Sequence, residues 1–132
     1  MAIYAIGASY SDSDVSGAFV KAGMACIGWN KTDAEPLYSL MATIRVGDII
    51  YIKAHPPQIG LIIKAVGVVT DARLRLHRTL NYGIKVSWVW SGEERLGHLN
   101  DKYPVRNITL YEEHNSKVAA RVISLLLSQL SI

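Results

Sequence analysis

Short apolar runs separated by polar clusters recur along most of the chain. Runs rich in Ile, Val, Leu and Tyr predict strands at 2–8, 24–27, 49–53, 59–70, 84–90 and 108–111. Apolar residues at helical spacing predict helices near 15–22, 36–44 and 116–130. The resulting order, β-α-β-α-β-β-β-β-α, indicates one α+β domain over residues 1–132. Because the later strands follow one another without helices, we expect a bent, largely antiparallel sheet or open β-barrel of about six strands flanked by three helices.

Local signals refine these boundaries. Ser11 with Asp14, and Thr32 with Glu35, have the spacing of capping boxes, and Pro36 suits the first position of a helix. A glycine inside the fourth run, Gly67, predicts a bulge or a close backbone approach. We interpret 71–83 as a loop or ragged strand and 91–94 as a turn.

Strict alternation in 84–90 predicts a strand with two different faces. One face would carry Ile84, Val86, Trp88 and Trp90, and the other Lys85, Ser87 and Val89. The central position of Trp88 favours a place in the core. Trp90 lies near the strand end, where either a core or an open position fits.

Composition limits the class of protein. The 132 residues are 50% hydrophobic and 19% charged, which excludes a disordered chain, and the net charge of +3 is compatible with a polyanionic partner. The single cysteine, Cys26, excludes an intrachain disulfide and a multi-cysteine zinc site, and it favours a reducing compartment. No charge-free stretch approaches the ~20 residues of a bilayer span, and no leader pattern is visible. We therefore expect a cytoplasmic protein with no membrane partner.

Motifs of catalysis and metal binding are not visible. The four histidines lack metal-ligand spacing, no Ser-His-Asp set stands out, and neither GxxxxGK[ST] nor GxGxxG occurs. We expect no metal, no cofactor and no catalytic activity, although folding can bring together a site that spacing does not reveal.

Three features have both a structural and a functional interpretation. Trp29 follows an apolar run and precedes polar residues, so its ring either covers the rim of the core or stacks on a nucleobase. Arg73, Arg75 and Arg78 either protect a strand edge or hold phosphates. The closing helix carries a broad apolar stripe, which packs on the sheet or pairs two copies of the chain.

The order of several motifs resembles the PUA-like superfamily, most closely its EVE branch and the related YTH domains. The motifs are Ser9-Tyr10-Ser11 after the first strand, Ala25-Cys26-Ile27-Gly28-Trp29, Arg45-Val46-Gly47-Asp48 before Ile49–Lys53, Ala65-Val66-Gly67-Val68-Val69, and Ile84–Val89. The resemblance extends from Ala2 to about Tyr111. It implies a bent-barrel module that binds nucleic acid and takes a modified or flipped base into an aromatic-lined pocket.

By this resemblance Trp29 forms one pocket wall, and the ends of two strands line the rest. The tryptophans of the YTH pattern are missing from 73–83, which favours an EVE-like site over a methyl-adenine cage. The expected base-binding residues are Ser9, Tyr10, Ser11, Trp29, Asn30, Lys53, His55, His77 and Tyr82. The expected phosphate-binding residues are Arg73, Arg75, Arg78 and Lys85.

The leading hypothesis is a non-catalytic module that recognises a modified base in DNA or RNA, as a monomer or weak homodimer. One alternative is a small hydrolase of modified nucleosides with Lys53 as its catalytic candidate, since related PUA-like proteins include such enzymes. Another is a protein-interaction or regulatory subunit that uses the C-terminal helix.

Overall fold

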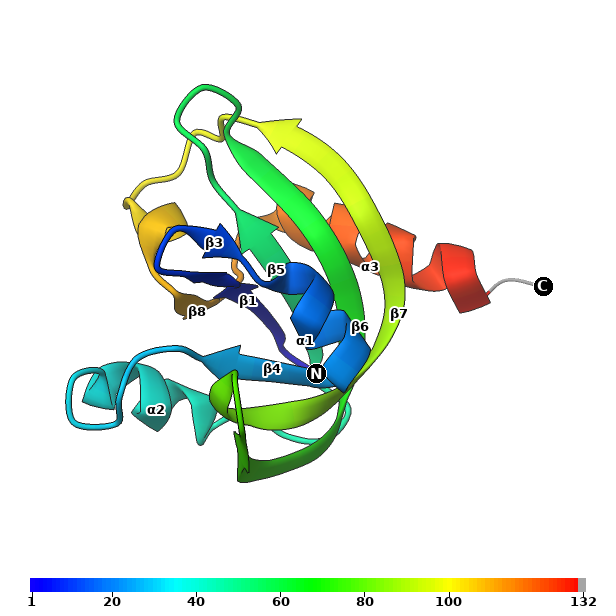
Figure 1. Ribbon diagram of the computed structural model, residues 1–132. Helices are drawn as coiled ribbons and strands as arrows, with labels where there is room; N and C mark the ends of the chain where they lie inside the picture. The colour runs from blue at the N-terminus through cyan, green and yellow to red at the C-terminus, as the bar shows by residue number, and fades with distance from the viewer. Residues whose placement is uncertain (131–132) are drawn as a thin grey trace.

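One curled sheet forms a half-barrel in the structure, a computed structural model that describes residues 1–130 (Figure 1). Within those residues six strands lie in the order β4-β7-β6-β5-β1-β8, with three α-helices around them. The strands of the sheet are β1 (Ile3–Gly7), β4 (Met24–Ile27), β5 (Ile49–Ala54), β6 (Leu61–His77), β7 (Asn81–Gly97) and β8 (Leu110–Glu112). The other elements are the hairpin β2 (Ser9–Tyr10) and β3 (Ser13–Asp14), the helices α1 (Ser16–Ala22), α2 (Glu35–Met41) and α3 (Ser116–Leu130), and the 3₁₀ helix η1 (Val105–Asn107). The predicted α+β class is confirmed.

Antiparallel neighbours dominate the sheet, as predicted. Only β1 and β5 run parallel, with Ile3 opposite Ile49 and Gly7 opposite Lys53, among the pairings of residues 1–130. A parallel pair needs a crossover connection, and the chain supplies it through α1, β4 and α2. This crossover brings the ends of β1 and β5 together at one edge of the half-barrel.

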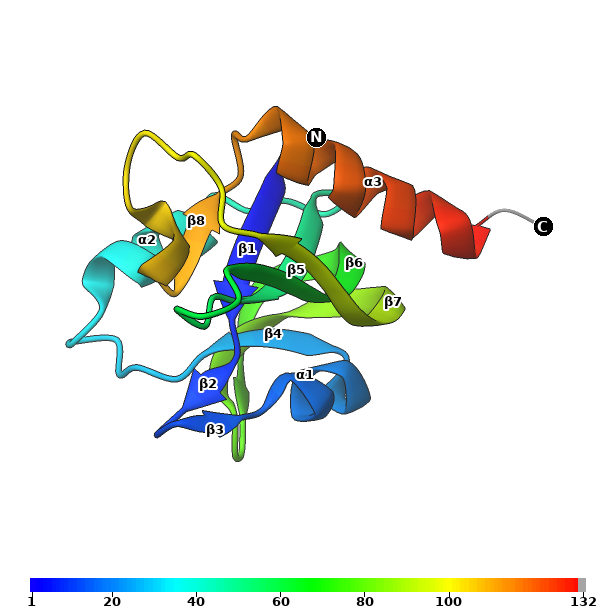
Figure 2. The same cartoon turned by 90° about the horizontal axis from the view of Figure 1, so that it is seen from above.

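Both faces of the sheet are covered. Along β5, Ile50 and Ile52 pack in the same cluster as Phe19 of α1. Ile49 and Tyr51 point the other way, into the cluster that contains the buried face of α3. Figure 2 shows α1 and α3 on opposite sides of the sheet. A strand buried on both faces has no polar face, which explains the continuous apolar run of β5.

The long ribbon of β6 and β7 decides between two alternatives and corrects one prediction. Both strands have 17 residues, so of the two interpretations of 71–83 the ragged strand is correct and the loop is not. The predicted turn at 91–94 is wrong, because Ser91–Glu94 lies inside β7. The turn between the strands is at 78–80. Several register shifts interrupt the pairing, and a shift by one residue, such as the one between Val66 and Gly67, changes the phase of the hydrophobic alternation. The polar segments 71–77 and 91–94 therefore lack the regular alternation that identifies a strand from sequence, although both belong to the ribbon.

Gly67 marks one of these shifts. The register changes between Val66 and Gly67, and a Cβ added to Gly67 would lie 2.6 Å from the carbonyl oxygen of Ser87. The prediction of a bulge with close backbone approach is confirmed.

The same shift separates two tryptophans that were expected on one face. Trp88 packs against the cluster on the α1 side, and its Nε1 donates to the carbonyls of Phe19 and Met24 at 3.1 and 3.2 Å. Trp90 and Val89 both pack against the cluster on the α3 side instead. The predicted shared face of Trp88 and Trp90 is wrong, because the bulge inverts the alternation between them.

Neither predicted capping box forms. Ser11 lies in the turn of the β2–β3 hairpin with a φ of 50°, outside α1. Asp14 still serves α1, because its Oδ1 accepts hydrogen bonds from the backbone N–H and the hydroxyl of Ser16 at 2.9 and 2.7 Å.

The second helix also begins without the expected side-chain cap. Its N-cap is Ala34, with no side-chain hydrogen bond, so Thr32 and Glu35 form no box. Pro36 lies in the first turn, as predicted, where its missing N–H leaves no helical hydrogen bond unmade. The helix ends at Met41, so Ile44 is buried beyond it.

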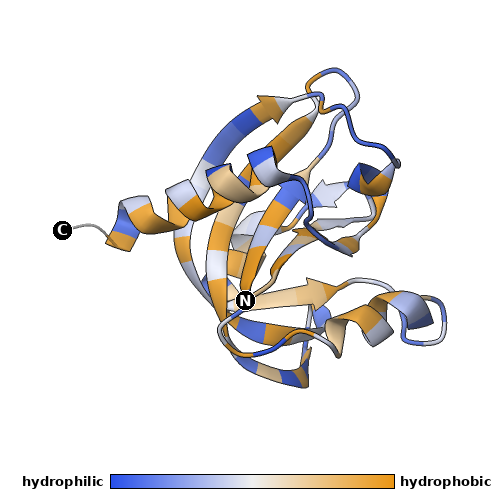
Figure 3. Cartoon of the chain, turned by 180° about the vertical axis from the view of Figure 1, so that it is seen from behind, coloured by the Kyte–Doolittle hydropathy of each residue, from blue (hydrophilic) through white to orange (hydrophobic). Residues whose placement is uncertain are grey.

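The closing helix begins and ends where the periodicity predicts. Asn115 caps it, since its Oδ1 accepts the backbone N–H groups of Lys117 and Val118 at 2.9 and 3.2 Å. Apolar and polar residues alternate along α3 where it lies across the back of the sheet (Figure 3). Its buried face packs on the sheet, while Leu127 and Leu130 are exposed. No helix among residues 1–130 is long and apolar enough to cross a membrane.

Candidate functional site

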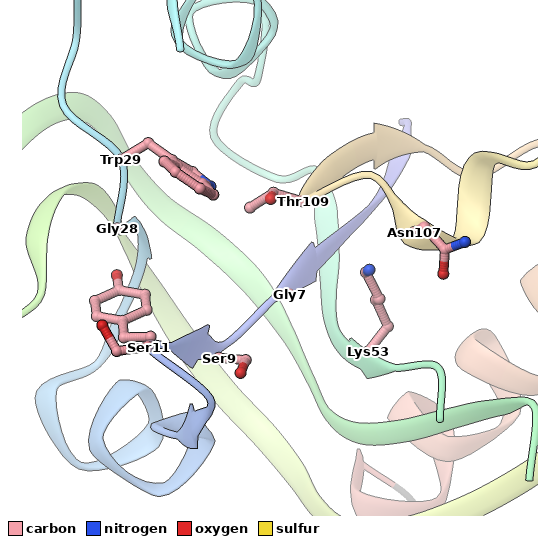
Figure 4. Close-up of a pocket in the computed structure, with 9 residues that line it drawn as sticks. Gly7, Ser9, Ser11, Gly28, Trp29, Lys53, Asn107 and Thr109 are labelled. Atoms are coloured by element: carbon pink, nitrogen blue, oxygen red, sulfur yellow. The ribbon is translucent and has the colours of Figure 1, made fainter. Parts of the chain in front are cut away.

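A pocket of about 520 Å³ opens where β1 ends, between the β4–α2 loop and the segment before β8 (Figure 4). Its volume is in the range of small-molecule sites. Five predicted base-binding residues line it: Ser9, Tyr10, Ser11, Trp29 and Lys53. Four further lining residues were not predicted: Gly7, Gly28, Asn107 and Thr109. The structure therefore brings together the core of the predicted set and adds a wall from the C-terminal third of the chain.

Trp29 supplies an accessible aromatic face. The residue is 58% exposed, and Figure 4 shows its indole reaching toward Thr109 across the pocket. Its backbone is held firmly, because its carbonyl accepts hydrogen bonds from Tyr38 Oη at 2.7 Å and from Asn81 Nδ2 at 3.1 Å. The ring is thus open while the loop beneath it is fixed. Trp29 therefore lines the pocket with its ring open, and its role as a stacking wall for a base remains a prediction.

Tyr10 is a rigid wall of the pocket. Its hydroxyl donates to the carbonyl of Leu80 at 2.6 Å, and its ring meets Phe19 edge-on at 6.0 Å between centroids. Burial raises the pKa of the Tyr10 phenol. The ring also lies against Gly28, where a Cβ would come within 2.8 Å of Tyr10 Cε1. The glycine before Trp29 is therefore what lets Tyr10 take this position.

Lys53 brings a buried ammonium to the pocket. The residue is 9% exposed and lies opposite Gly7 in the parallel pair. Its side chain lies beside Gly7, where a Cβ would be in ordinary contact with Nζ at 3.6 Å. Nζ donates to the carbonyl of Arg106 at 2.8 Å. Burial, and then the Arg106 guanidinium, lower the pKa of the lysine from 10.5 to about 8.

A buried ionic network supports the wall behind Lys53. Arg106 is 4% exposed and binds Asp101 through two hydrogen bonds, from Nε at 2.8 Å and Nη2 at 2.9 Å. Its Nη1 donates to Glu113 and, at 3.1 Å, to the hydroxyl of Tyr111. Tyr51 also donates its hydroxyl hydrogen to Glu113. Pairing offsets the cost of burying the charges of Arg106 and Glu113, so the network fixes η1 against β5 and β8.

The segment after η1 carries the unpredicted lining residues. Thr109 faces the pocket, and its carbonyl accepts the Gly7 N–H at 2.7 Å, which ties this wall to the end of β1. Asn107 is the last residue of η1. No sequence signal identified either residue, because about one hundred positions separate them from the first strand and only the sheet brings them together.

Two predicted residues on the β6–β7 ribbon do not line this pocket. His77 Nδ1 accepts the backbone N–H groups of Thr79 and Leu80 at 3.2 and 3.1 Å, so it stabilises the ribbon turn. Tyr82 packs edge-on against Tyr38 at 6.5 Å, and the Lys31 ammonium lies 4.0 Å from its ring centre. Both residues support the region that carries the Trp29 loop.

Asn30 and His55 also lie outside the lining of this pocket. The carbonyl of Asn30 accepts the N–H groups of Asp33 and Ala34, which shapes the turn before α2. His55 lines an adjoining hollow of about 310 Å³, which shares Lys53 with the main pocket, and its ring contacts His98 edge-on at 6.0 Å.

Two arginines of the predicted basic segment form ion pairs with Asp71, at the start of the segment. Asp71 receives two hydrogen bonds from Arg73 Nε and one at 2.7 Å from Arg73 Nη2, and Arg75 Nη2 donates to it at 2.7 Å. The Arg73 hydrogen bonds, and then that of Arg75, lower the pKa of this carboxyl. Arg78 and Lys85 are exposed, and no ion pair joins either to another described residue. Asp71 therefore partly neutralises Arg73 and Arg75, and phosphate binding by this segment stays a prediction.

Other chemistry is sparse in the described part of the chain. No group of three or more His, Cys, Asp or Glu residues within 1–130 is placed to hold a metal ion. Burial raises the pKa of the Cys26 thiol to about 12, so it is a poor nucleophile. The pocket thus offers one exposed ring, one buried ammonium and the polar groups of Ser9, Ser11, Asn107 and Thr109.

Neither a scan against protein-family models nor a search of curated proteins finds a match to the chain. The resemblance to PUA-like domains therefore remains a prediction from the order of the motifs. The case for function depends on the geometry of the pocket.

Proposed function

We propose that this protein is a non-catalytic module that binds DNA or RNA by taking a modified, flipped base into the pocket beside Trp29. The observation that carries the proposal is the open indole on a fixed loop. A large ring that is 58% exposed contributes little to the core, but it offers a flat apolar surface to a heterocycle. The resemblance of the motif order to the EVE branch favours the same class.

The energetics of such a site are reasonable. Extracting a base from its stack costs a few kcal/mol, which the pocket must return. Stacking on an aromatic ring contributes ~1–3 kcal/mol per base. Hydrogen bonds from the pocket to the polar edge of the base add to this. Binding therefore requires both the Trp29 face and a polar partner on the opposite side, and Lys53, Asn107 and Thr109 supply that side.

The test is a titration of labelled single-stranded DNA and RNA oligonucleotides that carry a panel of modified bases, followed by fluorescence anisotropy. Trp29→Ala should weaken binding about fivefold to a hundredfold, the equivalent of the stacking energy. Tyr103→Ala is the matched control, because Tyr103 is 64% exposed but lies outside this pocket. Both variants should melt like the wild type. Unchanged affinity in Trp29→Ala would overturn the assignment of the pocket.

A second candidate function is supported by Lys53. With a pKa of about 8, roughly a tenth of this amine is neutral near pH 7, and a neutral amine can act as a nucleophile or general base. This favours a hydrolase of modified nucleosides as the alternative. Incubation with a panel of modified nucleosides, analysed by chromatography, separates the two. Turnover that Lys53→Met abolishes would support the hydrolase, and intact nucleosides would support the binding module.

A further inference from the structure

The donor capacity of Lys53 is only partly used inside the protein. An ammonium has three N–H groups, and within residues 1–130 Nζ donates one hydrogen bond, to the carbonyl of Arg106. The Tyr111 ring centre is 5.8 Å from Nζ, and the Arg106 guanidinium adds a repulsive positive charge. Unlike Arg106, Lys53 has no ion pair with a described carboxylate. A buried cation in this state gains from any acceptor that enters the pocket.

Lys53 differs in kind from the other polar side chains that line the pocket. The hydroxyls of Ser9, Ser11 and Thr109 and the amide of Asn107 can each donate or accept, so they adapt to either edge of a base. An ammonium can only donate. The N–H of Gly7, the nearest backbone donor in β1, is already bonded to Thr109. The indole N–H of Trp29 also only donates, but Trp29 offers the face of its ring to a base, so polar discrimination in the pocket falls mainly to the charged donor, Lys53.

We propose that Lys53 makes the pocket selective for nucleobases whose facing edge presents a carbonyl oxygen, over those that present an amino group. This rests on the proposed function and specifies its ligand class. A carbonyl oxygen accepts a charge-assisted hydrogen bond from Nζ. An amino group at the same place opposes donor to donor and leaves the buried ammonium without its new partner.

The experiment uses single-stranded oligonucleotides that differ only in one central base. The matched pairs exchange an amino group for a carbonyl: 5-methylcytosine with thymine, 5-hydroxymethylcytosine with 5-hydroxymethyluracil, and adenine with hypoxanthine. For wild-type protein at pH 7 we expect the carbonyl member to bind about tenfold to a hundredfold more tightly, the range of a charge-assisted hydrogen bond.

Variants at Lys53 and Lys31 test whether the Lys53 ammonium causes the preference for the carbonyl member. Lys53→Met keeps the length of the side chain but removes the donors, and it should bind both members of a pair equally. Lys31→Met removes the same charge from the exposed loop outside the pocket, and it should keep the preference. Should Lys53→Met fold poorly, Lys53→Gln, which can donate or accept, should also lose the preference.

The outcomes separate this inference from the proposed function. Trp29-dependent binding that is equal for both members, or that favours the amino member, overturns the role of Lys53 and leaves the proposed function standing. A carbonyl preference that survives in Lys53→Met and Lys53→Gln overturns it as well. If no oligonucleotide binds in a Trp29-dependent way, both proposals fail.

Discussion

Replacing Lys53 by Met should change how the stability of the protein depends on pH. The pKa of Lys53 falls from its ordinary 10.5 to about 8 because burial disfavours the ammonium and Arg106 repels it. The unfolded chain therefore binds more protons than the native state between these two values. Stability must rise with pH across this interval, and the native state bears the full penalty of the buried charge below pH 8.

The magnitude follows from the shift. A difference of 2.5 between the two pKa values corresponds to about 3 kcal/mol, because each unit is worth about 1.4 kcal/mol. Between pH 7 and pH 9.5, the free energy of unfolding of the wild type rises by about 2 kcal/mol as the penalty of the buried ammonium is relieved. Lys53→Met has no such group. The free energy of unfolding of the wild type, relative to Lys53→Met, should therefore increase by about 2 kcal/mol over this range.

Urea denaturation at pH 7, 8 and 9.5, followed by tryptophan fluorescence and circular dichroism, measures the effect. Tyrosines with raised pKa values, such as Tyr10 and Tyr51, lower the stability of the native state above about pH 10. Both proteins contain these tyrosines, so their contribution largely cancels in the difference between wild type and Lys53→Met. Lys31→Met should run parallel to the wild type. Parallel curves for the wild type and Lys53→Met would refute a buried, poorly compensated ammonium in the pocket.

Three further predictions test the walls and the charged surface. Gly28→Ala should destabilise the fold by ~1–3 kcal/mol in urea denaturation, because its Cβ would overlap the ring of Tyr10. Gly17→Ala, whose Cβ would lie in open space, is the control and should not destabilise the fold. Equal stability of Gly28→Ala and wild type would contradict the packing of Tyr10 on Gly28. Arg106→Leu should cost ~3–5 kcal/mol, because it leaves Asp101 and Glu113 without their buried partner, and a melting temperature within a degree of wild type would rule this out. If phosphates contact the ribbon, Arg78→Gln and Lys85→Gln should flatten the salt dependence of oligonucleotide binding more than Arg73→Gln, whose charge Asp71 already compensates; a larger effect of Arg73→Gln would reverse this ranking.

Local patterns were sufficient where one element buries one continuous face. The helix Ser116–Leu130 was predicted to the residue, because its stripe repeats at helical spacing over four turns and packs on the sheet without interruption. The strand β5 was identified from its apolar run for a different reason, because both of its faces are buried and the run is therefore continuous. Prediction failed in the β6–β7 ribbon, where bulges reverse the alternation and place Trp88 and Trp90 in different cores.

The sequence by itself determined the α+β class, most elements of the fold, and an aromatic residue on a loop at Trp29. It also identified five residues that line the pocket, through the motifs at strand ends that resemble those of PUA-like domains. Only the tertiary structure decided that Lys53 is buried beside the pocket and that Asn107 and Thr109 close its far side. It also decided that Asp71 forms ion pairs with Arg73 and Arg75. These are contacts between side chains or between distant segments, and their strength depends on burial and distance, which no local spacing specifies.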